Sequence, residues 1–336
     1  MKRYKIFITR KIPEPAIKLL RNYFSVSVFG ENRPIRKIEL IKSIKDKVGI
    51  ITLLTDFVDR EILENAMTLR MIANYAAGYN NIDIEEATKR GIMVTNTPDV
   101  LTETTADLTF GMILAIARRI PEAEKFLRKN RFKGWAPLLF LGADVHHKTL
   151  GIIGMGRIGK AVARRALGFK MNVIYYDKVR LSPAEEKKLS ASYKPFNYIL
   201  KKADFITIHT PLTKETYHLF SEKEFSLMKK TAFIINTARG PVIDEKALIK
   251  ALNNKKIGGC ALDVFENEPV VSEELKKMDN VLLLPHIGSA TLETRTNMAL
   301  MCAENLITAL IKNKRPPNLV NPEVLNIKYA NTHLPK

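Results

Sequence analysis

A glycine-rich turn in the middle of the chain constrains the fold more than any other feature. Residues 154–159 read Gly-Met-Gly-Arg-Ile-Gly, which matches G-x-G-x-x-G. An apolar run at 150–153 precedes the turn, and a helical pattern follows from Lys160. In such a context the first glycine permits a tight turn, the second lets the backbone approach a pyrophosphate, and the third lets helix and strand pack closely. We therefore predict an α/β domain that binds a dinucleotide at a helix N-terminus, with an ordinary strand–turn–helix as the alternative. The predicted contacts are Gly154, Gly156, Arg157, Ile158 and Gly159.

The end of the next predicted strand bears on which dinucleotide is bound. Asp177 follows the apolar run 173–176 and lies 18 residues after Gly159. A carboxylate at this point can accept hydrogen bonds from the ribose hydroxyls of NAD, and it repels the 2′-phosphate of NADP. Lys178 and Arg180 come directly afterwards and could pair with that phosphate. The pattern favours NAD and leaves NADP as an alternative.

The rest of the chain alternates short apolar strands with amphipathic helices. Such alternation is typical of parallel sheets that are covered by helices on both faces. In the first hundred residues we expect strands at 4–9, 25–29, 48–53, 70–74 and 93–96, and helices at 15–23, 38–44, 59–66 and 84–90. In the second half we expect strands at 150–153, 173–176, 205–209, 232–236, 259–263 and 281–284. The sequence thus predicts two doubly wound, Rossmann-like units.

Two long helical patterns indicate how these units are connected. One covers 102–120 and is expected to stop near Pro121, and the other covers 291–312. If both cross between domains, residues 101–289 form a dinucleotide-binding domain inserted into a first domain made of 1–100 and 290–336. The Pro- and Asn-rich tail that follows the second helix is predicted to be loop.

Composition excludes several other classes of protein. The 336 residues carry a formal charge of +19, but the basic residues form scattered pairs such as Lys229-Lys230 and no run of five to eight. We therefore expect a basic surface that attracts small anions, and no nucleic-acid partner. With only Cys260 and Cys302, neither a disulfide framework nor a zinc cluster is expected, and no metal site is predicted. The short apolar N-terminus and the absence of any long apolar run favour a soluble cytoplasmic protein without membrane contact.

Three polar segments in the second half carry side chains suited to chemistry. Each follows a predicted strand, and they contain Arg239, Glu268 and His286. In an open α/β sheet, ligands bind outside the carboxyl ends of the strands. All three segments are therefore expected at the same crevice as the glycine turn. A residue of each of these types, taken singly, more often has a structural role, so the prediction depends on their occurring together.

These segments resemble those of the D-isomer-specific 2-hydroxyacid dehydrogenase family, over nearly the whole chain. The stretches that carry the resemblance are Ala-Asn-Tyr-Ala-Ala-Gly-Tyr at 73–79, Val-Thr-Asn-Thr-Pro-Asp-Val-Leu-Thr at 94–102 and Pro-His-Ile-Gly-Ser-Ala-Thr at 285–291. Within the family the likeness is greatest to archaeal-type glyoxylate reductases. The resemblance implies reduction of a small 2-oxo acid, with glyoxylate or hydroxypyruvate favoured, to the 2-hydroxy acid. It also implies a flavodoxin-like first domain that binds the substrate.

The resemblance assigns a role to each member of the trio, and chemistry supports the assignment. His286 supplies a proton to the carbonyl oxygen of the substrate. Glu268 hydrogen-bonds the imidazole and favours its protonated form. Arg239 binds the substrate carboxylate and polarises the carbonyl, for which its planar fork is better suited than a lysine. The nicotinamide provides the hydride.

The resemblance also implies a wider set of contacts. The strand end His209-Thr210-Pro211 is similar to the cofactor-lining segment of the family. The remaining cofactor contacts that it implies are Thr105, Thr237, Ala238, Arg239, Asp263, His286 and Gly288. For the substrate it points to Leu53, Ala77 and Gly78 as well as Arg239 and His286. Backbone N–H groups of the 76–78 turn are expected to hold the substrate carboxylate, unless the glycine serves only the turn.

A last segment, residues 132–137, contains the only tryptophan, Trp135. In the family this arm helps to form a homodimer, and a buried anchor is the alternative for Trp135. Phosphonate dehydrogenases share the arm and an arginine like Arg295, but they place a lysine where Ala77 stands. Corepressors that reuse the fold as a dinucleotide-sensing binding module are an alternative of another class. They bind partners through an added N-terminal cleft and carry disordered tails, whereas we expect this chain to be compact and to lack such tails.

Overall fold

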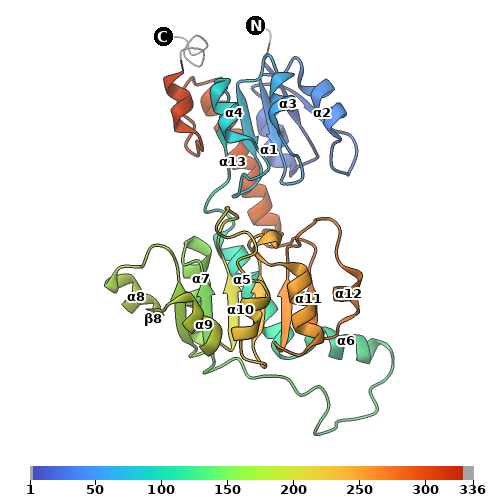
Figure 1. The fold of residues 1–336 in the computed structure, drawn as a ribbon. Coiled ribbons are helices and arrows are strands. Elements are labelled where there is room, and N and C mark those ends of the chain that lie inside the picture. Colours follow the sequence, from blue (N-terminus) through green and yellow to red (C-terminus); the bar gives the residue numbers. More distant parts are fainter. Residues whose placement is uncertain (1–2, 328–336) are drawn as a thin grey trace. The chain divides into compact units, whose positions relative to one another are not determined.

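The computed structural model describes residues 3–327, which form two compact units. One unit contains residues 3–101 and 289–327, and the other contains residues 102–288. Each unit is built on its own parallel β-sheet (Figure 1). The prediction of two doubly wound parallel α/β domains is confirmed.

The first unit has a five-stranded sheet in the order β2-β1-β3-β4-β5, which is the flavodoxin-like order. The strands are β1 (Lys5–Ile8), β2 (Ser25–Val28), β3 (Gly49–Thr52), β4 (Met71–Asn74) and β5 (Met93–Thr95). The helices are α1 (Glu14–Arg21), α2 (Lys37–Ile44), α3 (Arg60–Glu64), α4 (Ile84–Lys89), the long α13 (Leu292–Leu310) and the 3-10 helix η2 (Pro322–Asn326).

Both faces of this sheet are buried, as the apolar composition of its strands predicts. Because successive side chains of a strand point to opposite faces, neighbouring residues belong to different cores. In β3, Ile51 packs in the core that α1 and α13 contribute to, whereas Ile50 packs with residues of α2, α3 and α4. The C-terminal helix α13 is therefore an integral part of the first unit.

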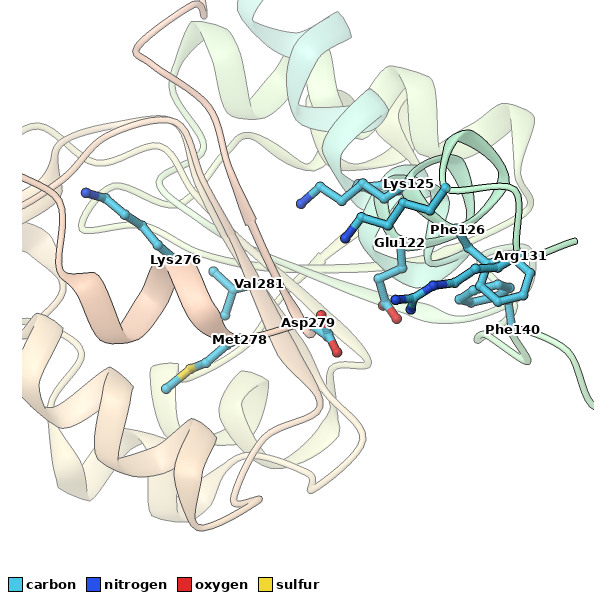
Figure 2. A pocket seen from close by; sticks show the side chains of 11 residues that line it. Glu122, Lys125, Phe126, Arg131, Phe140, Lys276, Met278, Asp279 and Val281 are labelled. Atoms are coloured by element: carbon cyan, nitrogen blue, oxygen red, sulfur yellow. The ribbon is translucent and has the colours of Figure 1, made fainter.

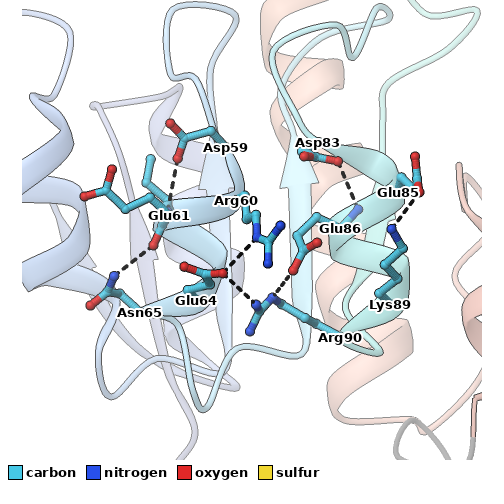
Figure 3. Close-up of polar contacts among 11 residues, drawn as sticks. Asp59, Arg60, Glu61, Glu64, Asn65, Asp83, Glu85, Glu86, Lys89 and Arg90 are labelled. Atoms are coloured by element: carbon cyan, nitrogen blue, oxygen red, sulfur yellow. Dashed lines mark hydrogen bonds and ion pairs between the residues drawn. The ribbon is translucent and has the colours of Figure 1, made fainter.

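Helices α3 and α4 lie side by side and are tied together by charges (Figure 3). Asp59 and Asp83 cap their N-termini by accepting hydrogen bonds from the N–H groups of Ile62 and Glu86. Arg90 pairs with Glu86 in its own helix at 2.7 Å and reaches Glu64 of the neighbouring helix at 3.4 Å. These exposed pairs orient the helices but contribute little to the free energy of unfolding, about 0–1 kcal/mol each.

The second unit has a seven-stranded sheet in the order β12-β11-β10-β9-β6-β7-β8. Strands β7 and β8 lie on one side of β6, and the later strands β9 to β12 lie on its other side. The strands are β6 (Thr149–Ile153), β7 (Asn172–Tyr176), β8 (Ala191–Tyr193), β9 (Phe205–Ile208), β10 (Phe233–Asn236), β11 (Gly259–Leu262) and β12 (Val281–Leu283). The helices are α5 (Thr102–Ala117), α6 (Ile120–Arg128), α7 (Arg157–Gly168), α8 (Pro183–Leu189), α9 (Phe196–Lys202), α10 (Glu222–Leu227), α11 (Glu245–Asn253), α12 (Glu273–Lys277) and the 3-10 helix η1 (Gly240–Val242).

Two cores again cover the two faces of the sheet. One contains side chains of α5 and α7, such as Ile113 and Val162, packed on Ile152 of β6. The other contains side chains of α9, α10 and α11, such as Leu248, packed on Ile206 and Ile234. The reversal in strand order leaves a switch point at the carboxyl ends of β6 and β9, where α/β sheets bind ligands.

The boundary predicted near Pro121 is wrong. Helix α5 ends at Ala117, and Pro121 lies in the first turn of a second helix, α6. The break comes instead at Arg119, which has a left-handed backbone with φ of 54°. Proline is tolerated in a first helical turn because the N–H groups there have no partner within the helix. Similarly, α7 begins at Arg157 and not at Lys160, because Gly156 occupies the N-cap position.

The C-terminal tail was predicted to be loop, but the 3-10 helix η2 forms within it. Residues 328–336, which include His333, lie outside the described residues. Across residues 3–327 no helix is long and apolar enough to span a membrane. The same residues contain no group of three or more His, Cys, Asp or Glu side chains arranged to hold a metal ion.

Candidate active site

The glycine turn lies between β6 and α7, where its geometry requires glycine at two positions. Gly154 has φ of 93°, and a Cβ atom on it would lie 2.7–2.9 Å from the backbone of His209 and Thr210. At Gly159 a Cβ atom would collide with the carbonyl oxygen of Gly154. Gly156, in contrast, faces open space, with no atom within 4 Å of its Cβ position. The turn is therefore packed on its strand side and open at the residue that caps α7, as a site for a pyrophosphate requires.

Asp177 stands beside this turn, directly after β7. Its Oδ2 accepts a hydrogen bond from the Met155 N–H at 2.6 Å, and its Oδ1 accepts one from the Val179 N–H at 3.1 Å. The carboxylate is thus fixed next to the glycine turn, which is where an acid that binds ribose hydroxyls belongs. Lys178 lies 3.8 Å from Glu215 in an exposed pair, whereas Arg180 is bound to Glu186 through two bonds of 2.9 Å.

The segment His209-Thr210-Pro211 follows β9, the strand next to β6. Both ring nitrogens of His209 and the hydroxyl of Thr210 are buried and have no hydrogen-bond partner in the described chain. Burial lowers the pKa of His209 to about 3, so the ring is neutral at physiological pH. Buried polar atoms rarely lack partners in a finished site. Together with the open glycine turn, these unpartnered atoms fit a polar cofactor such as a nicotinamide dinucleotide.

Arg239 belongs to a turn that follows β10. The buried side chain of Asn236 closes the turn, since its Nδ2 donates to the Arg239 carbonyl at 2.9 Å and its Oδ1 accepts from the Ala238 N–H at 3.0 Å. The hydroxyl of Thr237 lies 3.0 Å from that of Thr109 in α5. Burial lowers the pKa of Arg239, and the charge of Glu268 opposes that shift. The guanidinium is held in a turn where it can bind an anion.

Glu268 and His286 form a hydrogen-bonded pair. The imidazole Nδ1 lies 2.9 Å from Glu268 Oε2, while Glu268 Oε1 accepts a bond of 3.1 Å from the Phe265 N–H. Burial raises the pKa of Glu268, but the hydrogen bond and charge of His286 outweigh it, so the pKa stays below its usual value. The carboxylate is therefore ionised at neutral pH and fixes the ring orientation. Because Nδ1 is engaged, the other ring nitrogen, Nε2, is left for a ligand.

The buried carboxylate of Asp263 shapes the backbone on which His286 stands. Its two oxygens accept hydrogen bonds from the N–H groups of Ile287 at 2.7 Å and Gly288 at 2.8 Å. Burial raises the pKa of Asp263, and these two bonds partly offset the shift. Thr105 adds a bond from its hydroxyl to the Gly288 carbonyl at 3.1 Å. The turn is thereby held in the left-handed conformation that His286 adopts, with φ of 55°.

The carboxylate of Glu266 makes a second set of contacts that holds these loops. Glu266 Oε1 bonds His218 Nε2 at 2.8 Å, and Glu266 Oε2 accepts from the Glu245 N–H at 3.1 Å. Gly240, next to Arg239, packs so closely on the Phe265 carbonyl that no side chain fits there. These contacts join the loop after β10 to the loop after β11. Nothing in the sequence pattern indicated His218 as part of such a brace.

In the first unit, the predicted substrate residues lie after β3 and β4. The carbonyls of Ala77 and Gly78 are occupied, since they accept from Asn96 Nδ2 at 2.6 Å and from Asn74 Nδ2 at 2.9 Å. Among residues 3–327, the N–H groups of Ala77 and Gly78 donate to no protein acceptor. Two adjacent unpartnered N–H groups suit an anion. Leu53 differs, because its N–H is already bound by Asp56 at 2.7 Å.

A buried polar network supports both loops, and sequence reasoning missed it. Asn81, 7% exposed, donates to the carbonyls of Leu53 at 3.1 Å and Asp56 at 3.0 Å, and it also bonds Asn74. Asp56, 2% exposed, accepts from the hydroxyl of Thr9. Burial raises the pKa of Asp56, although these hydrogen bonds oppose the shift. Asn74 and Asn81 belong to the 73–81 stretch of the sequence, but only their burial shows that they hold it in shape.

Comparison with known proteins agrees with this arrangement. Residues 110–288 match the family described as D-isomer specific 2-hydroxyacid dehydrogenase, NAD binding domain. A glyoxylate reductase of Thermococcus litoralis is 53% identical over 325 residues, covering 96% of this chain and 98% of the relative.

The chain belongs to the D-isomer specific 2-hydroxyacid dehydrogenase family.

Two solved structures extend the comparison to the whole fold of this dehydrogenase. A glyoxylate reductase from Paecilomyes thermophila is 34% identical, with a TM-score of 0.85 over 96% of this chain and 99% of that one. An NADPH-dependent glyoxylate/hydroxypyruvate reductase from Sinorhizobium meliloti, solved with NADP and malonate, is 31% identical, with a TM-score of 0.86 over 96% and 98%. The predictions of an NAD(P)-dependent oxidoreductase and of the dehydrogenase family are therefore confirmed.

The arm of the dehydrogenase that contains Trp135 projects its apolar side chains outwards. Trp135 is 85% exposed, Leu138 is 78% exposed and Leu141 is 62% exposed. The alternative of a buried anchor for Trp135 is therefore wrong. Large apolar side chains exposed along one short segment are typical of a protein interface.

One hollow of the second unit lies away from the residues described above. It has a volume of about 230 Å³ and lies between α6 and the segment that leads into β12 (Figure 2). Lys125, Arg131 and Lys276 line it together with Asp279 and the ring of Phe140. It is found at the amino end of β12, whereas His286 follows the carboxyl end. This hollow is therefore not part of the candidate active site.

Proposed function

We propose that this dehydrogenase reduces glyoxylate or hydroxypyruvate to the corresponding 2-hydroxy acid with NADH. The observation that carries the proposal is the His286–Glu268 pair, with Nδ1 and Oε2 2.9 Å apart, on loops that are braced against the loop of Arg239. A fixed acid and a fixed guanidinium at the carboxyl ends of neighbouring strands are what reduction of a 2-oxo acid requires. The named glyoxylate reductases among the relatives support the choice of substrate.

His286 acts as the proton donor in this proposal. With Nδ1 bound to the ionised Glu268, the protonated ring presents its Nε2–H to the carbonyl oxygen of the substrate. A bound nicotinamide supplies the hydride to the carbonyl carbon. Arg239 binds the substrate carboxylate and polarises the carbonyl, so that negative charge developing on the oxygen is stabilised before the proton arrives.

The first unit contributes backbone groups in place of charged side chains. The free N–H groups of Ala77 and Gly78 hold the substrate carboxylate, because their carbonyls are tied up and their geometry is set by Asn74 and Asn96. Leu53 has no free N–H and contributes its side chain.

The turn formed by Gly154, Gly156 and Gly159 and the first residues of α7 would hold the pyrophosphate of the cofactor, for which we propose NAD. Asp177 binds the adenosine ribose and disfavours a 2′-phosphate. His209 and Thr210 line the site, where the neutral imidazole provides a hydrogen-bonding group without exchanging protons with the substrate. The other contacts are those predicted from sequence, namely Thr105, Arg157, Ile158, Lys178, Pro211, Thr237, Ala238, Asp263 and Gly288. Arg180, which was also predicted, is bound to Glu186.

The exposed arm is proposed to pack against a second copy of the chain, which makes the dehydrogenase a homodimer of the cytoplasm. The support is the exposed apolar cluster of Trp135, Leu138 and Leu141. The two buried free thiols, Cys260 and Cys302, agree with a reducing compartment. Light scattering on a sizing column should give twice the chain mass, and Trp135→Ser with Leu138→Ser should shift it towards one chain. A wild-type monomer, or an unchanged dimer in the double variant, contradicts the proposal.

The experiment that tests the reaction is a panel of 2-oxo acids assayed with NADH and NADPH in parallel. We expect glyoxylate and hydroxypyruvate to give the highest kcat/KM, with NADH preferred. A larger 2-oxo acid as the best substrate would assign the chain to another D-2-hydroxyacid dehydrogenase. Oxidation of phosphite would favour a phosphonate-type enzyme. Tight NADH binding without turnover of any acid would favour a dinucleotide-sensing binding module.

A further inference from the structure

Arg180 lies on the loop that follows β7, close to the proposed ribose site, and the structure does not leave it free. Its Nε and Nη2 bond the two oxygens of Glu186 in α8, each at 2.9 Å. This is the two-point geometry that makes an arginine–carboxylate pair specific as well as strong. The guanidinium also lies over the ring of Tyr193, 5.7 Å from its centre. Arg180 is thus held by the protein at three points.

Glu186 is itself fixed from another direction. Its Oε1 accepts a bond of 2.7 Å from the hydroxyl of Tyr175, a residue of β7 with no exposed surface. The same hydroxyl accepts a bond of 2.9 Å from the Leu181 N–H. The pKa of Glu186 is lowered to about 2, chiefly by the bond from Arg180 and then by that from Tyr175. The carboxylate is therefore ionised at neutral pH.

In the loop 177–181, Asp177 and Arg180 would have opposite effects on the binding of a 2′-phosphate. Asp177 repels the phosphate, whereas an arginine near this position can accommodate it. As long as Glu186 holds Arg180, the repulsion by Asp177 is not compensated. The other cation of this loop, Lys178, is exposed, and its pair with Glu215 at 3.8 Å is loose.

We propose that Glu186 determines the preference of this enzyme for NADH over NADPH by sequestering Arg180. The inference rests on the proposed use of a nicotinamide dinucleotide and adds a residue that lies on α8, outside the glycine turn and the strand end that follows it. Glu186 touches neither cofactor nor substrate in this account and acts through Arg180. It is therefore a positioning residue for cofactor specificity.

The test measures binding of the dinucleotides and does not depend on turnover. Glu186→Gln keeps the shape of the side chain and its acceptor for Tyr175 but removes the charge that holds Arg180. Dissociation constants for NADH and NADPH, measured by quenching of protein fluorescence, and for 5′-AMP and 2′,5′-ADP by calorimetry, report the 2′-phosphate effect separately from the nicotinamide. We expect the ratio Kd(NADPH)/Kd(NADH) to fall roughly tenfold, as for one charge-assisted hydrogen bond gained.

Two further variants make the result specific. Glu185→Gln makes the same change in charge one residue away on the same helix, where the carboxylate pairs with Lys160 at 2.5 Å, and it should leave the ratio unchanged. The double variant Glu186→Gln with Arg180→Ala should return the ratio to the wild-type value, because no guanidinium remains to be released. Thermal melting of each variant checks that the fold is retained.

The proposal is overturned if Glu186→Gln leaves the ratio unchanged, or if the gain in NADPH binding persists when Arg180 is removed. A wild-type enzyme that binds both dinucleotides equally also contradicts it. Failure of the proposed reaction looks different, since NADH then binds with the expected dependence on Glu186 but no 2-oxo acid is reduced. Failure of the cofactor assignment would show as no binding of either dinucleotide to the wild type.

Discussion

The carboxyl edges of the two sheets are built in different ways. At the edge of the second unit, charged side chains stand on turns that buried polar residues hold in place: Asn236 holds the turn of Arg239, and Asp263 holds that of His286. At the edge of the first unit, the groups offered are backbone N–H groups, and the buried residues Asn74 and Asn81 occupy the neighbouring carbonyls. The first arrangement can move protons and stabilise charge, whereas the second can only bind. We infer that the second unit performs the chemistry and the first selects the substrate.

This division of labour predicts the largest effect at His286. Replacing it by asparagine removes the proton donor but keeps a hydrogen-bonding side chain on the turn that Asp263 holds. We expect kcat to fall roughly a thousandfold, within the range for loss of a general acid. The dissociation constant for NADH should change by less than about threefold, because no proton is transferred in binding. Stopped-flow kinetics and NADH titration measure the two quantities. Near-normal turnover would contradict the assignment of His286 as the proton donor.

A smaller loss is expected for Arg239→Lys. Lysine keeps the charge but lacks the planar fork that binds a carboxylate through two nitrogens, so kcat/KM should fall roughly a hundredfold. Arg119→Lys offers a matched control, since that residue pairs with Glu122 at the start of α6 and should tolerate the change. Equal catalytic efficiency of wild type and Arg239→Lys would mean that the fork is not used.

Substitutions in the first unit should raise the KM for the 2-oxo acid and change kcat little. Asn81→Ala leaves the carbonyls of Leu53 and Asp56 without their donor, so both loops should lose their shape. We expect the KM for the 2-oxo acid to rise roughly tenfold, and the free energy of unfolding to fall by about 1–3 kcal/mol. Asn65→Ala, at an exposed helix end, serves as the control. If kcat fell as far as KM rose, the two units would not divide the work as proposed.

The smallest effect concerns stability and pH. The folded pKa of His209 is about 3, well below that of a histidine in an unfolded chain. Below about pH 6.5 the unfolded state therefore binds a proton that the folded state does not, and stability falls as the pH drops. His209→Gln should reduce the slope of unfolding free energy between pH 6 and pH 4, by up to about 1.4 kcal/mol per pH unit. Urea titrations measure the slope, with the exposed His146→Gln as control; identical slopes in wild type and His209→Gln would contradict the burial of a neutral ring.

Structural features could be predicted from the sequence where the residues that form them are close along the chain or follow a regular pattern. Strand alternation and the glycine turn are local patterns, so both sheets and the cofactor edge could be predicted. The placement of Arg239, Glu268 and His286 at one edge could be predicted because each follows a strand, and parallel strands end at one edge. The supports could not, because Asp263 binds N–H groups 24 and 25 residues away and Glu266 meets His218 48 residues away. No periodicity encodes such contacts.

The errors at helix ends have the same origin. Pro121 is compatible both with the end of one helix and with the first turn of the next, and only Arg118 and the left-handed Arg119 separate α5 from α6. The role proposed for Glu186 likewise depends on the approach of α8 to the loop of Arg180, which no sequence pattern indicates. Sequence patterns thus identify the groups that can act, and tertiary contacts decide which of them are free to do so.

The most direct test of the account follows the hydride itself. Purified enzyme is incubated with glyoxylate and NADH that carries deuterium at C4 of the nicotinamide on either face, and the product is analysed by mass spectrometry. We predict a 2-hydroxy acid with one deuterium on its hydroxyl-bearing carbon from one of the two labelled forms, and none when His286→Asn is used over the same time. Unlabelled product from both forms, or no 2-hydroxy acid from the wild-type enzyme, would contradict the central claim.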